Sequence, residues 1–226
     1  MDPIPWIAKN YIEIFGAVTG IIYVFLEIRQ TTWLWPVGIV TSAVYIWVFF
    51  HGKLYADMSL QVYYLVISFL GWYWWIKGTS GYQAAGKESS GSEGDDSGDL
   101  LHVTRLKLKT GIMLSIVFIA LYFTLWYILS RMTDSPVPEL DSFITSLSIV
   151  ATWMLARKIY EHWYLWIIVD FVASLLFIYR GLYPTVVLYF VYGAMSFAGL
   201  IEWKKSIVSD VNGNQVEVSI GNDYKK

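Results

Sequence analysis

The sequence predicts an all-α membrane protein with seven transmembrane helices. Hydrophobic residues make up 56% of the chain, aromatic residues 18% and charged residues only 15%, and the mean hydropathy is +0.49. A soluble domain could not bury that much apolar surface. The apolar residues also fall into runs of about 17 to 25, the length that crosses a hydrocarbon core of about 30 Å as a helix.

The first four runs are distinguished by how few charges interrupt them. Tyr11–Ile28 contains only Glu13 and Glu27, both nearer its ends, while Trp33–Phe50 contains no charged residue. The third, from 55 to 76, ends in the aromatic sequence GWYWWI, and the fourth, from 111 to 129, is uncharged. Each is long enough to span the membrane.

The last three runs are less uniform. Asp141–Ala156 is the shortest, and its flanks DSFITS and RK are polar. Trp163–Tyr179 is apolar except for polar residues that include Asp170, and Leu182–Ile201 contains no charge. We count both as spans, and we include the fifth run to give seven.

The positions of the 16 Lys and Arg residues predict the orientation. With seven spans, alternate loops lie on opposite sides; one side collects 12 of these residues and the other 4. Basic residues are retained on the cytoplasmic side. We therefore expect the N-terminus outside and the C-terminus in the cytoplasm of a multi-pass bacterial inner-membrane protein.

A polar segment divides the chain. Residues 78–99 contain 11 Gly or Ser in 22 positions and an acidic cluster, which is typical of a flexible linker. The predicted organisation is a first three-helix bundle (11–76), a flexible cytoplasmic linker (77–110), a connecting transmembrane helix (111–129), a second three-helix bundle (141–203) and a cytoplasmic tail (204–226).

The two sides of the linker resemble each other. Aligned without gaps, residues 54–75 and 182–203 are identical at eight of 22 positions, including Tyr64/Tyr192, Ser68/Ser196 and Gly71/Gly199. One helix separates the copies, so both enter the membrane in the same direction. The sequence therefore predicts a parallel 3+1+3 repeat, an arrangement that transporters use to enclose a site between two bundles. Duplication without transport is the alternative.

Asp170 is the deepest acid in any of the runs. A charge at the centre of a bilayer costs about 2.5–3.5 kcal/mol on insertion scales, so such residues usually face a cavity or a partner. Residues three, four or seven apart share a helical face. Four helices thereby offer polar and aromatic groups at comparable depth, and we expect the substrate-binding residues to be Thr41, Tyr45, Gln61, Tyr64, Ser68, Trp72, Trp163, Trp166, Asp170, Tyr189, Tyr192 and Ser196.

Two other interpretations of these residues stay open. Ser and Thr often bond helix to helix, and Trp and Tyr often form interfacial belts. The acid together with aromatic faces suits a flat cationic ligand, but Asp170 could instead bind a coupling proton. The sequence does not separate the two.

Several function classes lack their residues. The chain has no cysteine, and its three histidines show no metal-ligand spacing, so we expect no enzyme, metal site or cofactor. A retinal photoreceptor needs a lysine in the last helix, which 182–201 lacks. We expect no nucleic-acid partner.

Two stretches resemble the PnuC family of vitamin-precursor transporters, best known for nicotinamide riboside uptake: GKLYADMSLQVYYLVISFLGWYWW (52–75), and EHWYLWIIVD (161–170) with its upstream LSIVATWMLARK. The resemblance implies the parallel 3+1+3 fold that is related to the sugar-transporting SWEET proteins. It also implies a homotrimer in membrane lipid and facilitated diffusion of a cationic vitamin, with trapping by a cytoplasmic vitamin kinase.

The resemblance covers some predicted site residues and departs at others. It implies binding roles for Gln61, Gly71, Trp72, Trp163, Trp166 and Tyr189. Nicotinamide riboside transporters tend to have Asn where this chain has Thr41, Ser68 and Asp170. Both nicotinamide riboside and thiamine carry a fixed positive charge, so the carboxylate favours a cationic vitamin without choosing between them.

Overall fold

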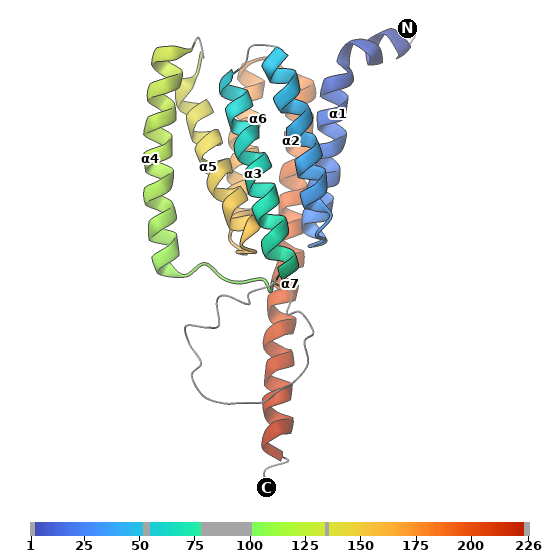
Figure 1. Cartoon of the computed structure of the whole chain (residues 1–226), viewed down its shortest axis with the longest axis vertical. Coiled ribbons are helices and arrows are strands. Elements are labelled where there is room, and N and C mark those ends of the chain that lie inside the picture. Colours follow the sequence, from blue (N-terminus) through green and yellow to red (C-terminus); the bar gives the residue numbers. More distant parts are fainter. Residues whose placement is uncertain (1–2, 52–54, 78–100, 134–135, 224–226) are drawn as a thin grey trace. The chain divides into compact units, whose positions relative to one another are not determined.

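The described residues of the chain fold into seven α-helices. The computed structural model describes residues 3–51, 55–77, 101–133 and 136–223, and side chains outside 1–11, 13, 55–57 and 208–223. The helices, labelled in Figure 1, are α1 Pro3–Ile28, α2 Leu34–His51, α3 Tyr55–Lys77, α4 Leu108–Met132, α5 Pro138–Ala156, α6 His162–Tyr179 and α7 Tyr183–Asp223.

The all-helical prediction is confirmed, with each predicted run inside or nearly inside one helix. The largest differences lie at the two ends of the chain, where α1 begins at Pro3 and α7 continues to Asp223, beyond the apolar part of each helix. Backbone hydrogen bonds within a helix need no apolar side chains, so a helix can run past the point where its hydrophobic stretch ends. The predicted linker residues 78–100 lie outside the described residues.

Within the described residues, four helices are long and apolar enough to cross a membrane by themselves: α2, α4, α6 and residues Tyr183–Ile207 of α7. The polar residues of α5 explain why it falls short, because Ser142, Ser146, Ser148 and Thr152 are all buried. The hydroxyls of Ser142 and Ser146 donate to backbone carbonyls of α5 itself. A helix that turns such groups inward need not be uniformly apolar.

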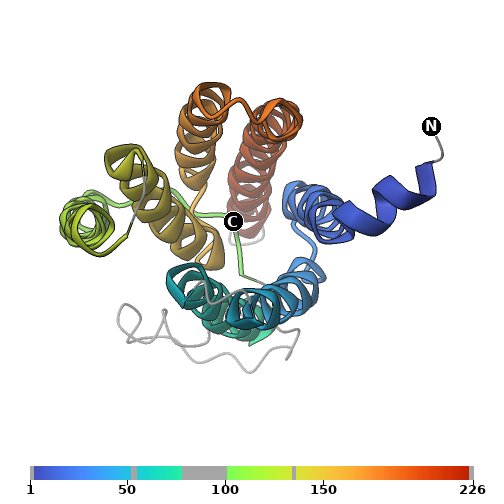
Figure 2. The ribbon, with the colours of Figure 1, turned by 90° about the horizontal axis from the view of Figure 1, so that it is seen from above.

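The chain forms two compact units. Unit 1 comprises Met1–His102 and Ile149–Lys158, and unit 2 comprises Val103–Ser148 and Ile159–Lys226. In unit 1, α2 packs along α3 and also contacts α1; in unit 2, α6 packs along α7. The end-on view shows each of these pairs as neighbours (Figure 2).

The ends of α1 and α5 adopt the same unusual backbone conformation. Gln30 and Lys158 have φ values of 53° and 49°, in the left-handed region that favours glycine. The Gln30 N–H donates to the Glu27 carbonyl, and the Lys158 N–H to the Leu155 carbonyl. When the ungapped alignment of the sequence repeat is extended to this region, it pairs Gln30 with Lys158 and Glu27 with Leu155.

A short extended segment holds the start of α4 in unit 2. Thr104 pairs with Ile159 as an isolated parallel β-bridge, and its carbonyl accepts the Tyr160 N–H at 2.9 Å. The Glu161 carboxylate accepts the Leu106 N–H at 2.8 Å. These bonds fix residues that the sequence assigned to the linker, because strand-like pairing cannot be read from one isolated bridge.

Candidate functional site

Asp170 is buried in unit 2, on the side of α6 that meets α7. Its side chain is 5% exposed. The Ser196 hydroxyl of α7 donates to Asp170 Oδ2 at 3.0 Å, and Ser196 is 3% exposed. Gly193, one turn earlier on α7, keeps the helices close, since a Cβ added there would lie 3.6 Å from the Asp170 Cβ. The carboxylate is thus inside the protein and hydrogen-bonded across two helices.

Two predicted tyrosines lie near this carboxylate. Tyr189 is close enough to Asp170 for their electrostatic interaction to be significant. Its ring contacts Phe177 at 5.1 Å and Tyr192 at 5.8 Å between centroids. The structure therefore brings four predicted residues of unit 2 together, from only two helices. An acid beside aromatic faces can hold a cation.

Trp163 is placed differently from the carboxylate group. It is 1% exposed, its ring lies edge-on to Trp203 at 5.8 Å, and it fills the space left by Gly199. His162, fully buried, contacts both tryptophan rings at 4.7 Å. Trp163 is a packing residue at the start of α6 in this conformation.

Trp35 has the same environment in unit 1. It is fully buried, lies edge-on to Trp75 at 5.4 Å and fills the space left by Gly71. We call these two arrangements, Trp35–Gly71–Trp75 and Trp163–Gly199–Trp203, the tryptophan locks. The ungapped alignment of the repeat pairs each position of one lock with the corresponding position of the other.

The predicted residues of unit 1 are more dispersed. Ser68 is buried at 4% and lies opposite Gly38, where the Tyr23 ring also approaches. Tyr45 donates its hydroxyl to the Ile12 carbonyl at 3.4 Å and packs between Phe15 and Phe49. Tyr45 thus braces α1 against α2.

The remaining predicted residues are accessible to different degrees. Trp72 is 36% exposed, whereas Thr41, Gln61, Tyr64, Trp166 and Tyr192 are half-buried. The Trp166 indole N–H is buried and has no hydrogen-bond partner among the described residues. Trp166 lies one turn before Asp170 on α6.

Sequence reasoning missed Tyr23 and underrated Glu27, both on α1. Glu27 is 2% exposed and acts electrostatically on Tyr23, although its position near a helix end suggested an interfacial anchor. Burial at a helix end depends on what packs there, which one sequence does not reveal. Among the residues that the structure describes, no group of three His, Asp or Glu could hold a metal ion.

Comparison with known proteins identifies the family. Residues 10–205 match the family model of the nicotinamide mononucleotide transporter. The chain belongs to the nicotinamide mononucleotide transporter family. It is therefore a multi-pass transporter of the bacterial inner membrane and not an enzyme.

Individual relatives differ in the substrate that they are named for. The chain is 28% identical to the riboflavin/roseoflavin transporter RibM of Streptomyces davaonensis, over 84% of this chain and 83% of that one. It is 25% identical to the nicotinamide riboside transporter PnuC of Escherichia coli, over 87% and 86%. The crystal structure of the vitamin B3 transporter PnuC superposes with a TM-score of 0.66 at 21% identity, over 89% of this chain and 84% of that one, which shows a shared fold.

Proposed function

We propose that this transporter carries a cationic vitamin or NAD precursor, with nicotinamide riboside as the first candidate. The observation behind the proposal is the buried carboxylate of Asp170, bonded to Ser196 beside Tyr189 and Tyr192. A carboxylate in a membrane interior is costly unless a cation or several donors balance it. A pyridinium ring provides both a positive charge and a flat face for the tyrosines.

The predicted residues have two roles in this proposal. Direct contact with the substrate falls to Asp170, Tyr189 and Tyr192, and to Trp166, whose buried N–H can donate to a substrate oxygen. Thr41, Gln61, Tyr64, Ser68 and Trp72 remain candidates from the other unit. Trp163 and Tyr45 support the walls, because both are committed to packing contacts. Ser196 orients the carboxylate.

We infer that the two units are copies related by the 3+1+3 repeat. Three independent features recur at positions that the ungapped alignment pairs: the tryptophan locks, the left-handed residues Gln30 and Lys158, and the turn bonds that precede α2 and α6. In those turns Leu34 N–H donates to Thr31, and His162 N–H to Ile159. Recurrence of this detail supports duplication of a whole structural unit.

Duplicated rigid units suit alternating access. Each tryptophan lock ties two helices together, so a unit can move without repacking inside. The transport we propose is facilitated diffusion into the cytoplasm, where phosphorylation by a vitamin kinase would trap the substrate. The homotrimer and the orientation with the N-terminus outside and C-terminus inside belong to the same proposal, the orientation resting on the 12 to 4 distribution of basic residues.

The decisive test varies the charge of the ligand at constant shape. Binding to the purified transporter would be measured for nicotinamide riboside and for its reduced form, a neutral dihydropyridine of nearly the same size. We expect the cation to bind at least tenfold more tightly, about 1.4 kcal/mol. Asp170→Asn should abolish that preference. Ser174→Ala is the matched control, since the Ser174 hydroxyl donates only to the Asp170 backbone carbonyl at 2.8 Å among its described bonds.

Uptake into proteoliposomes completes the test. Equal affinity for the charged and neutral ligands would exclude the charge argument. Thiamine binding that exceeds nicotinamide riboside binding would retain the cationic class and change the vitamin. Accumulation against a gradient, driven by a pH step, would replace facilitated diffusion by proton coupling through Asp170.

Riboflavin is the second candidate substrate, because the relative named for it is 28% identical over most of both chains. Riboflavin is neutral and larger than nicotinamide riboside. It would gain from the aromatic faces but not from the carboxylate. Riboflavin uptake that survives Asp170→Asn, without nicotinamide riboside uptake, would favour this candidate.

A further inference from the structure

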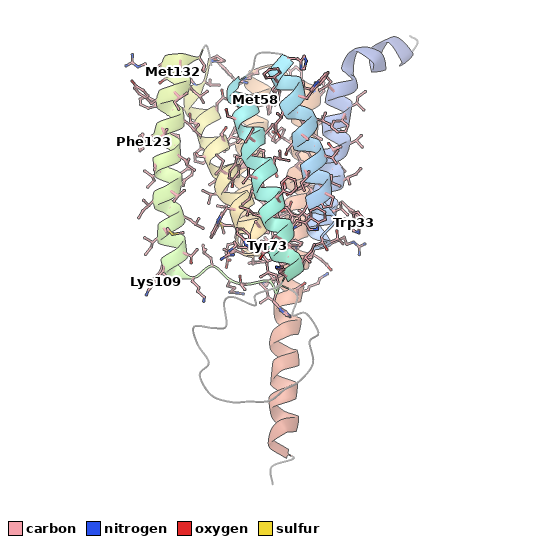
Figure 3. The ribbon with its side chains drawn as sticks, in the orientation of Figure 1. Trp33, Met58, Tyr73, Lys109, Phe123 and Met132 are labelled. Atoms are coloured by element: carbon pink, nitrogen blue, oxygen red, sulfur yellow. The ribbon has the colours of Figure 1, made fainter. Side chains whose placement is uncertain are left out.

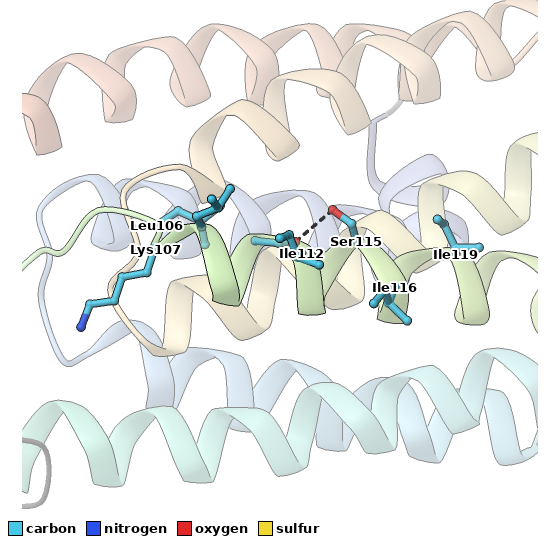
Figure 4. Close-up of a pocket in the computed structure, with 8 residues that line it drawn as sticks. Leu106, Lys107, Ile112, Ser115, Ile116 and Ile119 are labelled. Carbon is cyan, nitrogen blue, oxygen red and sulfur yellow. Dashed lines mark hydrogen bonds between the residues drawn. The ribbon is translucent and has the colours of Figure 1, made fainter. Parts of the chain in front are cut away.

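The first turns of α4 and the segment before it form an apolar groove in unit 2. The groove has a volume of about 490 Å³ and is lined by Leu106, Lys107, Leu108, Gly111, Ile112, Ser115, Ile116 and Ile119. Its aliphatic side chains are open, with Ile112, Ile116 and Ile119 each more than half exposed. Figure 4 shows them along one side of the helix. The Ser115 hydroxyl donates to the Gly111 carbonyl at 2.9 Å, so the polar group inside the groove is satisfied.

The groove faces a part of α4 that lipid can reach. Along this helix, side chains from Lys109 through Phe123 to Met132 stand out from the backbone (Figure 3). Only 6% of its most apolar stretch is buried. From Leu108 to Ile119 the helix rises about 16 Å, which is about half of a 30 Å hydrocarbon core. The groove therefore has the length of one leaflet, and of one acyl chain.

Basic residues gather at one end of the groove. Arg105, Lys107 and Lys109 alternate along the segment that leads into α4, and all three are exposed. Lys107 extends at the end of the groove (Figure 4). Glu161 is the acid that contacts this segment among the described residues, and it already accepts the Leu106 N–H. Burial raises the pKa of nearby Tyr160 to about 12, so its hydroxyl adds no negative charge at neutral pH.

We propose that this groove binds an anionic phospholipid. One acyl chain lies against the isoleucines of α4, and the phosphate lies among Arg105, Lys107 and Lys109. Charge complementarity selects the headgroup, because basic residues next to a transmembrane helix attract anionic lipids. The site is separate from the Asp170 group and does not depend on the transported substrate.

The test uses the full-length purified transporter, delipidated and titrated with phosphatidylglycerol or phosphatidylcholine, with bound lipid counted by native mass spectrometry. We expect phosphatidylglycerol to bind at least tenfold more tightly. Lys107→Gln should lower that preference about fivefold. Arg131→Gln, at the opposite end of α4, should leave it unchanged.

A second pair of variants tests the groove itself. Ser115→Phe fills it and should remove binding of both lipids. Ser130→Phe is the matched control: Ser130 is also exposed on α4, and its hydroxyl also donates to a carbonyl of its own helix. Equal binding of the two lipids would overturn the proposal. So would a Ser115→Phe variant that keeps its lipid, or one that changes only the oligomeric state, which would make this face a contact between copies.

Discussion

The tryptophan lock of unit 1 makes a sharp prediction about Gly71. A Cβ at this position would lie no more than 2.6 Å from three ring carbons of Trp35, whereas carbon atoms pack at about 3.5–4.0 Å. The ring would have to move by about 1 Å. Trp35 is fully buried and lies edge-on to Trp75, so no open space is available for that movement.

The expected cost follows from two opposing terms. Adding a methyl group to a filled core costs about 3 kcal/mol at the upper end of the usual range, because a rigid ring rather than a flexible chain is displaced. Replacing glycine by alanine inside a helix returns about 1 kcal/mol. We therefore expect Gly71→Ala to destabilise the protein by about 2 kcal/mol, or roughly 4–8 °C in a chain of this length. Gly199→Ala should do the same, since Trp163 approaches it equally closely.

Thermal unfolding of the purified protein in one detergent measures this series. Gly193→Ala is the control, because its Cβ would meet the Asp170 Cβ at an ordinary 3.6 Å. This variant should be as stable as the parent or slightly more so. If Gly71→Ala unfolds at the same temperature as Gly193→Ala, the lock is looser than its geometry indicates and the reasoning is wrong.

Three further substitutions test other parts of the fold. Gln30→Gly should stabilise by about 1 kcal/mol, because glycine adopts a positive φ without strain, whereas Lys158→Gly should gain less since it loses the contact of Lys158 Nζ with an indole ring at 4.4 Å. Arg180 and Asp141 form a partly exposed ion pair at 2.8 Å, and a double-mutant cycle with Gln and Asn should give a coupling of about 1 kcal/mol or less. Tyr63→Phe should destabilise by about 1 kcal/mol, as its hydroxyl donates to an α5 carbonyl at 2.7 Å.

Each of these has a clear contrary result in the same unfolding assay. Equal gains at Gln30 and Lys158 would mean that the cation–aromatic contact adds nothing. A coupling of zero between Arg180 and Asp141 would mark the pair as incidental. An unchanged midpoint for Tyr63→Phe would mean that water replaces the lost hydroxyl at that carbonyl.

Most of the fold was predictable because a membrane imposes a simple length rule. Apolar runs such as Trp33–Phe50 gave α2 to within one residue at each end, since charged and polar groups stop a membrane helix abruptly. The rule fails where the environment changes. The helical continuation of α7 to Asp223 and the pairing of Thr104 with Ile159 depend on backbone hydrogen bonds that hydropathy does not report.

The candidate site was predictable only in part. Spacing correctly put Asp170 and Ser196 at matching depth, because each sits on a regular helix. Spacing could not distinguish Trp163 from Trp166, which share a face but differ in burial. The first meets Gly199 on the neighbouring helix, and that contact depends on how two helices approach each other.

Positions 42 and 170 give the strongest reason to assign the carboxylate to function. The ungapped alignment of the repeat pairs Ser42 with Asp170 and Ser68 with Ser196, and all four are buried to a similar extent, at 3–5% exposure. Unit 1 therefore packs with a hydroxyl where unit 2 has a charge, so packing does not require the charge. Asp170→Ser should leave the unfolding temperature unchanged or raise it, because a buried charge is removed, while binding of the cationic vitamin is lost. A variant that instead unfolds several degrees lower while still binding the vitamin would show that the carboxylate holds α6 to α7 and does not contact the ligand.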